Sequence, residues 1–450
     1  MGGKLRLSSR DLRILVDAVR LAEEVKPSQD AKRRVFEEYG ILGTGLDSLL
    51  TVLFYDIMKK MGLLDKVVER ELNVNPLILD PWLRAALRIA LDIVLYHDPS
   101  NTTIKHLKWG VADYLSAKTH PFVGMYYWRL IDKWVNEGVK LEPRNEVEEL
   151  EFKYLLPAWF IEKMQKLLGV SEAEKLFDAL NKSLPISIRV NTLKASVDEV
   201  VEELKREGKN PEVSRRVPVV IRFEGPYNFN KSKLFQQGKI VIQDEPAALA
   251  SILLGVRPGM VVVDLCAAPG GKTTHIAEIM KNEGVIYAFD IDKARIKRMR
   301  ELLKRTGTHR IVRIIINDGA KAPEILGEEI ADRVLVDPPC SSTGTLPKNP
   351  ELRWRLIEDK LKDIIENQRR LLEAAVRLLK PGGRLLYTTC SLLVEENEGN
   401  VKWLLEKYPK LKLIPLKGPY DEGFLPGTMR AWPHRHGVTG FFYALIEKKE

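Results

Sequence analysis

Cysteine is scarce in this chain of 450 residues, which contains only Cys266, Cys340 and Cys390. No two of the three are close enough in sequence to form a CxxC metal or redox motif. A free cysteine is most often a small buried hydrophobe, and that is the simplest interpretation of all three. Each one nevertheless falls at the end of an expected strand, which points to chemistry rather than packing.

Long apolar runs are also missing from the sequence. Its apolar stretches are far too short to span a bilayer, and the opening MGGKLRLSSRDL has no apolar signal core. We therefore expect a cytoplasmic protein with no membrane partner. The 45% hydrophobic and 30% charged content is typical of a globular chain. The net charge of +9 favours a polyanionic partner such as RNA or DNA.

Residues 1–142 are predicted to form an all-α domain. Apolar residues recur there at three-to-four spacing, between glycines and prolines that punctuate the pattern. The helices expected are Asp11–Ala22, Ala31–Tyr39, Leu46–Met61, Pro81–Tyr96, Thr103–Lys118 and Phe122–Glu137. An aromatic cluster at Met125–Trp128, with Trp134, is more typical of a core than of an RNA-stacking surface.

Residues 143–240 are predicted to hold linking helices and a small α+β module. The charged stretch Glu142–Glu151 contains Pro143 and is interpreted as a linker. The elements expected after it are helices Pro157–Leu168, Ser171–Leu180 and Ser196–Glu207, and strands Ile186–Val190 and Val217–Phe223. Ser196 is a candidate N-cap for its helix, with Glu199 at the third position.

Residues 241–450 are predicted to form an α/β domain with a seven-stranded Rossmann-like sheet. The strands expected are Val261–Asp264, Val285–Asp290, Ile311–Asp318, Arg333–Cys340, Arg384–Ser391, Leu411–Leu416 and Phe441–Ile446. Helices such as Asp363–Leu379 and Glu395–Lys407 separate most of them, which indicates parallel pairing with right-handed crossovers. No helix is evident between the last two strands, so we expect an antiparallel pair at one edge.

A turn of small residues follows the first of these strands, and we call Cys266–Lys272 the cradle. Its turn residues Ala267–Gly271 have almost no side chains, so a ligand can approach the backbone, and a helix is expected to begin at Lys272. The cradle is neither G-x-G-x-x-G nor G-x-x-x-x-G-K-[ST], which disfavours NAD and a bound triphosphate. A nucleoside cofactor without phosphates, S-adenosylmethionine (SAM), fits instead. Asp290 follows at the distance of a ribose-binding acid, although a strand-end acid often caps a turn.

The sequence Asp337-Pro338-Pro339-Cys340 places a thiol after a rigid turn at another strand end. C5 of cytosine is a poor nucleophile and does not take a methyl group directly. A thiolate that adds to C6 makes C5 nucleophilic, and loss of the C5 proton later expels the thiol. Cys340 and Cys390 both fall where this chemistry is expected, and the residues alone do not choose between them.

Three motifs in combination resemble the Sun/Fmu family of RNA (cytosine-5) methyltransferases, of the NOL/NOP/Sun class. They are VVVDLCAAPGGKTTHIAEIM, DPPCSSTGTLPKNPE and YTTCSLLVEENEGNV. ISIRVNTLK, GKIVIQDEPAALA and PHRHGVTGFF also match, so the resemblance runs from about Leu156 to the end. The N-terminal helices more weakly resemble the NusB-type RNA-binding domain, chiefly in LRAALRIALDIVLYHD and FVGMYYWRLIDKW.

The resemblance implies a role for each site residue. Cys390 would be the nucleophile that attacks C6, and Cys340 would assist release of the methylated RNA. Asp337 would bond the N3/N4 edge of cytosine, with Lys272 in the same pocket. SAM contacts would come from Cys266, Ala267, Ala268, Pro269, Gly270, Gly271, Lys272, Asp290, Asp318 and Asp337. Arg189 and Asn191 would face the RNA, and no metal is expected.

The resulting expectation is a monomeric enzyme that methylates C5 of a cytosine in RNA. Ribosomal RNA is favoured over tRNA because the NusB-like domain resembles that of rRNA-modifying members. DNA cytosine-5 methyltransferases place their nucleophile in the Pro-Cys motif, so the presence of both cysteines favours RNA. The alternatives are a tRNA enzyme, a DNA enzyme and a non-catalytic RNA-binding assembly factor. One departure is Thr439, where family members usually carry an acid.

Overall fold

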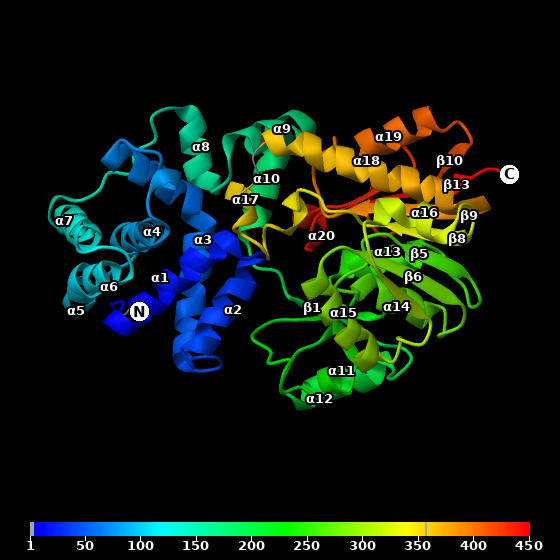
Figure 1. The fold of residues 1–450 in the computed structure, drawn as a ribbon, viewed down its shortest axis with the longest axis horizontal. Helices are drawn as coiled ribbons and strands as arrows, with labels where there is room; N and C mark the ends of the chain where they lie inside the picture. The colour runs from blue at the N-terminus through cyan, green and yellow to red at the C-terminus, as the bar shows by residue number, and fades with distance from the viewer. Residues whose placement is uncertain (1–3, 356–357) are drawn as a thin grey trace. The chain divides into compact units, whose positions relative to one another are not determined.

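The computed structural model describes residues 4–355 and 358–450 (Figure 1). The chain forms two compact units. Unit 1 comprises Met1–Phe177 and Asn349–Arg355, and unit 2 comprises Asp178–Lys348 and Leu356–Glu450. The first boundary therefore lies later than the expected end of the all-α domain at residue 142. None of the described helices is long and apolar enough to cross a membrane.

Unit 1 is helical, as predicted. Its elements are α1 (Ser9–Glu24), α2 (Ser28–Glu38), α3 (Gly45–Leu72), η1 (Pro76–Ile78), α4 (Pro81–Tyr96), α5 (Asn101–Lys105), η2 (His106–Gly110), α6 (Val111–Lys118), α7 (Pro121–Glu137), α8 (Glu146–Tyr154), α9 (Ala158–Leu168), most of α10 (Val170–Asn181) and α17 (Leu352–Arg355). The stretch expected to be one helix from Thr103 contains the π-helical segment η2. The expected linker Glu142–Glu151 is largely helical, because Asn145 caps α8 by accepting from the Glu148 N–H.

The aromatic cluster of α7 divides between core and surface. Tyr127 and Trp134 are fully buried, as the core interpretation predicts. Phe122 and Tyr126 lie on the other face of the same helix and are 70% and 43% exposed. Helical periodicity accounts for the split, since residues at opposite phases of the 3.6-residue repeat face opposite sides.

One segment of unit 1 comes from far along the chain. The Trp354 indole donates to the Lys59 carbonyl at 2.8 Å, and the Ser28 N–H donates to the Glu351 carboxylate at 3.0 Å. Gly62 of α3 makes room for the Trp354 ring, since a Cβ there would lie 2.2 Å from the ring. Residues 349–355 are thus built into the helical unit, an arrangement that local sequence patterns do not predict.

Unit 2 begins with the predicted α+β module. Its strands are β1 (Ile186–Val190), β2 (Glu212–Val213), β3 (Val220–Phe223) and β4 (Ile240–Ile242), which pair in the antiparallel order β2-β3-β1-β4. Its helices are α11 (Val197–Arg206) and α12 (Lys233–Gln236). The predicted N-cap is confirmed, because the Ser196 hydroxyl accepts from the Glu199 N–H at 3.1 Å. Strand β4 was not predicted.

A nine-stranded sheet forms the centre of unit 2. Its strands are β5 (Val261–Asp264), β6 (Val285–Asp290), β7 (Val312–Ile316), β8 (Ala331–Val336), β9 (Leu379–Thr389), β10 (Leu411–Ile414), β11 (Asp421–Glu422), β12 (Met429–Ala431) and β13 (Phe441–Lys448). The order is β11-β12-β13-β9-β8-β5-β6-β7, with β10 also paired to β13. Strands β5 to β9 are parallel, and β10 and β13 are antiparallel as predicted. The short strands β11 and β12 are additional.

Helices cover both faces of this sheet (Figure 1). One face packs against α13 (Glu245–Leu253), α14 (Gly271–Ile279) and α15 (Lys293–Thr306). The other packs against α16 (Ala322–Leu326), α18 (Leu361–Leu378) and α19 (Glu398–Lys407). The remaining short elements are η3 (Gly319–Lys321), η4 (Thr343–Thr345), η5 (Glu358–Lys360) and α20 (Pro433–His436).

The strand order reverses between β5 and β8. From β5 the chain adds β6 and β7 on one side, and then crosses over to add β8 and β9 on the other. In open α/β sheets ligands bind beyond the carboxyl ends of the strands at such a reversal. The topology therefore predicts a ligand site at the turns after β5 and β8, which are the cradle and the Asp337–Cys340 segment.

Candidate active site

The cradle runs from the end of β5 into the first turn of α14, with Gly270 as the N-cap of the helix. Gly270 has φ +100°, a conformation that side-chain-bearing residues rarely adopt. A Cβ at this position would also lie 2.9 Å from Met299. The Gly270 N–H donates to the Ala267 carbonyl at 2.8 Å, which closes the turn. The predicted strand, turn and helix are all confirmed.

A pocket of about 230 Å³ opens on the cradle. The predicted site residues that line it are Cys266, Ala267, Ala268, Pro269, Gly271, Lys272 and Asp337. Gln243, Asp244, Ala247 and Asp264 complete the lining and were not predicted as site residues. Small apolar side chains and a turn backbone beside three carboxyl groups suit a nucleoside with polar hydroxyl and amino groups. The residues present therefore fit SAM.

Asp290 and Asp318, also predicted to bind the cofactor, do not line this pocket. Asp290 at the end of β6 is 6% exposed and accepts from the Ala268 N–H at 3.1 Å and from the Asp292 N–H at 2.9 Å. The Asp290 carboxylate therefore fixes the backbone of the cradle at Ala268. Asp318 caps η3 through the Ala320 N–H and accepts from Arg370 at 2.8 Å. A cofactor contact by either residue stays a prediction.

Lys272 and Asp337 form an ion pair at the pocket, with 2.5 Å between Nζ and Oδ2. Lys272 comes from the first turn of α14 and Asp337 from the end of β8, so the topological reversal brings them together. Burial disfavours the charged ammonium, but the Asp337 carboxylate outweighs this effect and raises the pKa of Lys272. Both residues line the pocket on the cradle, and their contact with the cytosine base stays a prediction.

The two candidate catalytic cysteines lie side by side. Cys340 follows β8 and Cys390 follows β9, and their sulfur atoms are 3.2 Å apart. The Ser342 hydroxyl lies 3.4 Å from the Cys390 sulfur and 3.8 Å from the Cys340 sulfur. Because β8 and β9 are parallel neighbours, residues beyond their carboxyl ends meet at one edge of the sheet.

The surroundings of the two thiols favour different protonation states. The hydrogen bond from Cys340 lowers the pKa of Cys390; burial opposes it, and Ser342 and Lys272 act in the same direction as Cys340. That hydrogen bond and burial raise the pKa of Cys340 well above its ordinary value. Cys390 therefore has the lower pKa of the two thiols and is the one more readily deprotonated, with Cys340 as its hydrogen-bond partner. The thiolate is the nucleophilic form of cysteine.

A buried carboxylate, Glu396, ties the two cysteine loops together and was missed in the sequence. It accepts from the Ser341 N–H at 2.9 Å, from the Ser391 hydroxyl at 2.6 Å and from the Gln368 amide at 2.8 Å. Ser341 adjoins Cys340 and Ser391 adjoins Cys390, and their hydroxyls are 2.8 Å apart. The only sequence signal is an acid six residues after Cys390, which does not reveal that it is buried.

We expect Glu396→Ala to loosen the cysteine pair. Removing the carboxylate deletes three hydrogen bonds from buried donors, which should reduce the free energy of unfolding by about 3 kcal/mol. A displacement of about 1 Å between Cys340 and Cys390 should lower kcat by ~10²-fold. Thermal unfolding and steady-state kinetics measure both effects. Glu406→Ala, an exposed acid on α19, is the matched control, and equal effects of the two changes would contradict the positioning role.

The structure does not place Arg189 and Asn191 at an RNA-facing surface, contrary to the prediction. Both side chains are fully buried. Arg189 donates to Glu278 at 2.7 Å and to the Gly271 carbonyl of the cradle at 2.8 Å. Asn191 donates to the Gly238 carbonyl at 2.8 Å and to the Thr306 carbonyl at 2.9 Å. These two residues attach the α+β module to the cradle and to α15.

Two further sequence features have structural explanations. Burial raises the pKa of the Cys266 thiol well above its ordinary value, so Cys266 is a poor nucleophile and serves as a small residue in the cradle. Thr439, where the family resemblance predicts an acid, is 3% exposed and lies 3.4 Å from the Asp244 carboxylate through its hydroxyl. A hydroxyl avoids the like-charge contact that a second carboxylate would make there.

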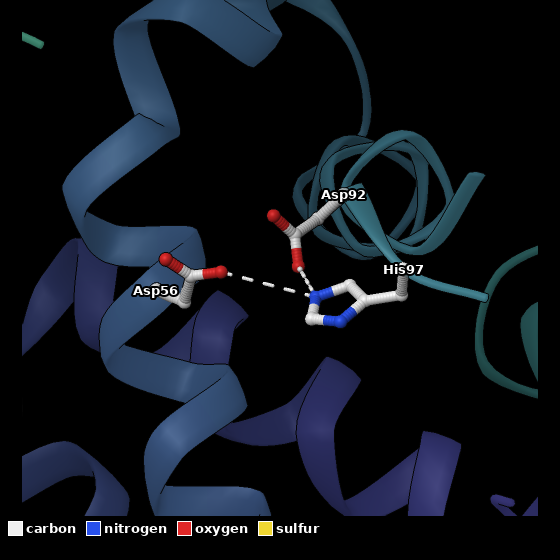
Figure 2. A group of neighbouring side chains, drawn as sticks. All are labelled: Asp56, Asp92 and His97. Atoms are coloured by element: carbon white, nitrogen blue, oxygen red, sulfur yellow. Dashed lines mark hydrogen bonds and ion pairs between the residues drawn. The ribbon is translucent and has the colours of Figure 1, made fainter. Parts of the chain in front are cut away.

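Among the described residues, one group of side chains comes close to a metal-binding arrangement. It consists of Asp56, Asp92 and His97 in unit 1 (Figure 2). Lys60 already balances both carboxylates, with Nζ 2.5 Å from Asp56 and 2.9 Å from Asp92. The His97 Nε2 lies 3.1 Å from Asp92. We assign this group to an ion-pair network between α3 and α4.

Comparison with known families agrees with the geometry of the site. Residues 251–447 match the family described as 16S rRNA methyltransferase RsmB/F. Residues 156–230 match the ferredoxin-like domain of RsmF/B-like methyltransferases. Ribosomal RNA small subunit methyltransferase B of Salmonella paratyphi C is 33% identical over 307 residues, which cover 68% of this chain and 69% of that protein.

Solved structures agree as well. The structure of PH0851 has a TM-score of 0.93 at 56% identity, and covers 99% of this chain and 100% of that chain. The structure of NSun6 from Pyrococcus horikoshii with SFG, a SAM analogue, has a TM-score of 0.60 at 27% identity, and covers 64% of this chain and 97% of that chain. The predicted SAM cofactor and methyltransferase class are confirmed. The chain belongs to the RsmB/F family of SAM-dependent methyltransferases.

Proposed function

We propose that this enzyme methylates C5 of a cytosine in 16S ribosomal RNA through a covalent bond between Cys390 and C6. One observation supports the proposal, the 3.2 Å contact between the sulfur atoms of Cys390 and Cys340 beside the cofactor pocket, in which Cys390 has the lower pKa. Cys390 alone could act as the nucleophile. The second thiol, Cys340, is positioned to help break the bond between C6 and the Cys390 sulfur and so to release the RNA.

When bound, SAM supplies an electrophilic methyl group on its sulfonium. The Cys390 thiolate adds to C6, and the electron pair of the C5–C6 double bond becomes available at C5. C5 would then take the methyl group from the sulfonium, whose sulfur would keep the electron pair of the broken bond. The Asp337 carboxylate accepts from the N4 amino group of the base and orients the ring over the pocket. Lys272 holds that carboxylate in place through the 2.5 Å ion pair.

Release of the product reverses the first bond. C5 loses its proton to a base or to water, the electron pair re-forms the C5–C6 double bond, and the bond between C6 and the Cys390 sulfur breaks. The departing thiolate regains the hydrogen bond from Cys340, which lowers its pKa and makes it a better leaving group. Cys340 is therefore assigned to release of the methylated RNA.

The choice of ribosomal RNA rests on the relatives. The family description names 16S rRNA, and the Salmonella relative is named for the small ribosomal subunit. The cytosine must leave any stacked helix to reach Cys390, as in other enzymes that modify bases. RNA-facing roles for unit 1 and for the α+β module stay predictions.

Transfer of labelled methyl groups to defined substrates tests the proposal. The purified enzyme should methylate 16S rRNA at C5 of cytosine, and the same position should be unmethylated in a strain without the gene. Transcripts of tRNA and DNA of matched sequence serve as competitors. Preferred methylation of tRNA or DNA, or no transfer to any RNA fraction, would contradict the proposal and favour one of the alternatives above.

The pH dependence of the first step gives a separate prediction. Cys390 must be a thiolate, so the rate of adduct formation falls as the pH falls through its pKa, which lies below that of an ordinary cysteine. Cys340→Ala removes the largest cause of the lowered pKa and should move this acidic limb to higher pH. Cys340→Ser retains a hydroxyl donor and should move it less. Single-turnover trapping on 5-fluorocytosine RNA, repeated over a range of pH, measures the pH at which adduct formation is half-maximal. If this pH were the same in Cys340→Ala and the wild type, the role of Cys340 in lowering the pKa of Cys390 would be contradicted.

A further inference from the structure

Helix α15 carries a high concentration of positive charge. Its 14 residues, KARIKRMRELLKRT, include seven basic side chains and one acidic side chain, Glu301, for a net charge of +6. The net charge of the whole chain is +9. Most of the excess positive charge is therefore gathered on one helix rather than spread over the surface.

Two of these arginines fasten the helix to its neighbours. Arg295 donates to the Ala268 carbonyl of the cradle and has Nη1 3.5 Å from Asp290. Arg305 donates to the Phe235 carbonyl at 2.8 Å, and its guanidinium lies 3.8 Å from the centre of the Phe235 ring. The first turn of α15 is thus held at the cofactor pocket and the last turn at the α+β module. These two arginines are not available to a partner.

Four other basic residues form an exposed row that we call the α15 stripe: Lys293, Lys297, Arg300 and Lys304. Their spacing of four, three and four places all of them on one face of the helix. Within the described part of the chain, none of the four forms an ion pair with a carboxylate. At ~1.5 Å per residue the stripe is about 16 Å long.

We propose that the α15 stripe binds the phosphate backbone of the substrate RNA next to the target cytosine. This inference rests on the proposed function, which supplies the RNA. A row of unpaired cations suits a polyanion with regularly spaced charges. The stripe starts at Lys293, three residues after Asp290, and so begins at the edge of the sheet where the cofactor pocket opens. Phosphate contacts of this kind position a strand without reading its sequence.

A membrane surface fits the helix less well. Helices that lie on membranes insert an apolar face between the lipids. The apolar face of α15, formed by Ile296, Met299 and Leu303, is buried in the core of unit 2. The exposed face of α15 therefore presents charged side chains, and no apolar face, to a partner. This favours binding to an RNA backbone over binding to a membrane.

The test compares two variants with the same loss of charge. The stripe variant is Lys297→Gln/Arg300→Gln/Lys304→Gln. The control is Lys362→Gln/Lys402→Gln/Lys412→Gln, three exposed lysines on other elements of unit 2. The affinity of each full-length protein for a 16S rRNA transcript is measured over a range of salt concentrations, and SAM binding serves as the check of folding.

We expect the slope of log affinity against log salt to decrease by about 2 in the stripe variant, since three phosphate contacts are lost at ~0.7 each. At ~0.1 M salt its affinity should fall by at least ~10-fold. The control should change by less than ~2-fold, and both variants should bind SAM like the wild type. An unchanged slope, or an equal loss in the control, would overturn the proposal.

Two other results distinguish this inference from a protein partner for the stripe and from failure of the proposed function. If binding to free RNA is unchanged but binding to assembled small ribosomal subunits is lost, the partner of the stripe is a protein and the inference is wrong. Lack of methyl transfer by the wild type would contradict the proposed function. In that case the salt dependence of RNA binding still reports on the stripe, so the two failures are distinguishable.

Discussion

Cys390→Ala is expected to abolish methyl transfer and to prevent any covalent adduct with 5-fluorocytosine RNA. The thiolate at this position forms the bond to C6, and without that bond C5 does not become nucleophilic. Removal of the nucleophile from an enzyme that uses covalent catalysis typically lowers kcat by about 10⁶-fold. The remaining methyl transfer should therefore be too slow to detect. Denaturing gels show the adduct, and release of label from SAM shows turnover.

Cys340→Ala is the matched variant, because it removes the other thiol of the same 3.2 Å pair. It should form the adduct and release it slowly. A covalent complex with RNA that contains ordinary cytosine should therefore accumulate, while turnover is lost. If Cys340→Ala prevented the adduct and Cys390→Ala accumulated it, the two roles would be exchanged. The same exchange would be expected of an enzyme that uses the cysteine of the Pro-Cys motif as its nucleophile.

Asp337→Asn is expected to produce the second large loss, about 10³-fold in kcat. The substitution removes the carboxylate that orients the base and leaves the Lys272 ammonium without its partner, in a site where preorganised charges contribute strongly to catalysis. Methyl transfer at saturating RNA and SAM measures the loss.

The control for this change is Asp363→Asn, which alters an exposed carboxylate in the first turn of α18. A double variant with Lys272→Met tests whether the two residues act together. If they do, the double variant loses about as much activity as Asp337→Asn alone, because the same interaction is broken in both. Fully additive losses would contradict a shared role for the ion pair.

Much of the catalytic unit follows from local sequence patterns. Parallel strands appear as short apolar runs, and their carboxyl ends meet at one edge of the sheet. For this reason the sequence alone predicts that the cradle, Asp337, Cys340 and Cys390 lie together. The antiparallel pair β10 and β13 followed from the lack of a helix between two apolar runs. The short strands β11 and β12 were missed because two or three residues carry no measurable periodicity.

Other features depend on contacts between residues distant in sequence. Arg189 and Asn191 appeared suited to RNA, but both are buried because their partners, such as Glu278 and Thr306, come from later helices. The segment 349–355 belongs to the helical unit through contacts with α2 and α3 that no local pattern announces.

The sequence alone therefore established the chemistry that this protein has available: a nucleoside cradle, an acid and two thiols at strand ends. It left open which thiol has the lower pKa. That choice depends on the hydrogen bond from Cys340 to Cys390, on Lys272 nearby and on the Glu396 network that holds both loops. A pKa depends on burial and on neighbouring charges in space, and these are properties of the folded chain rather than of residue order.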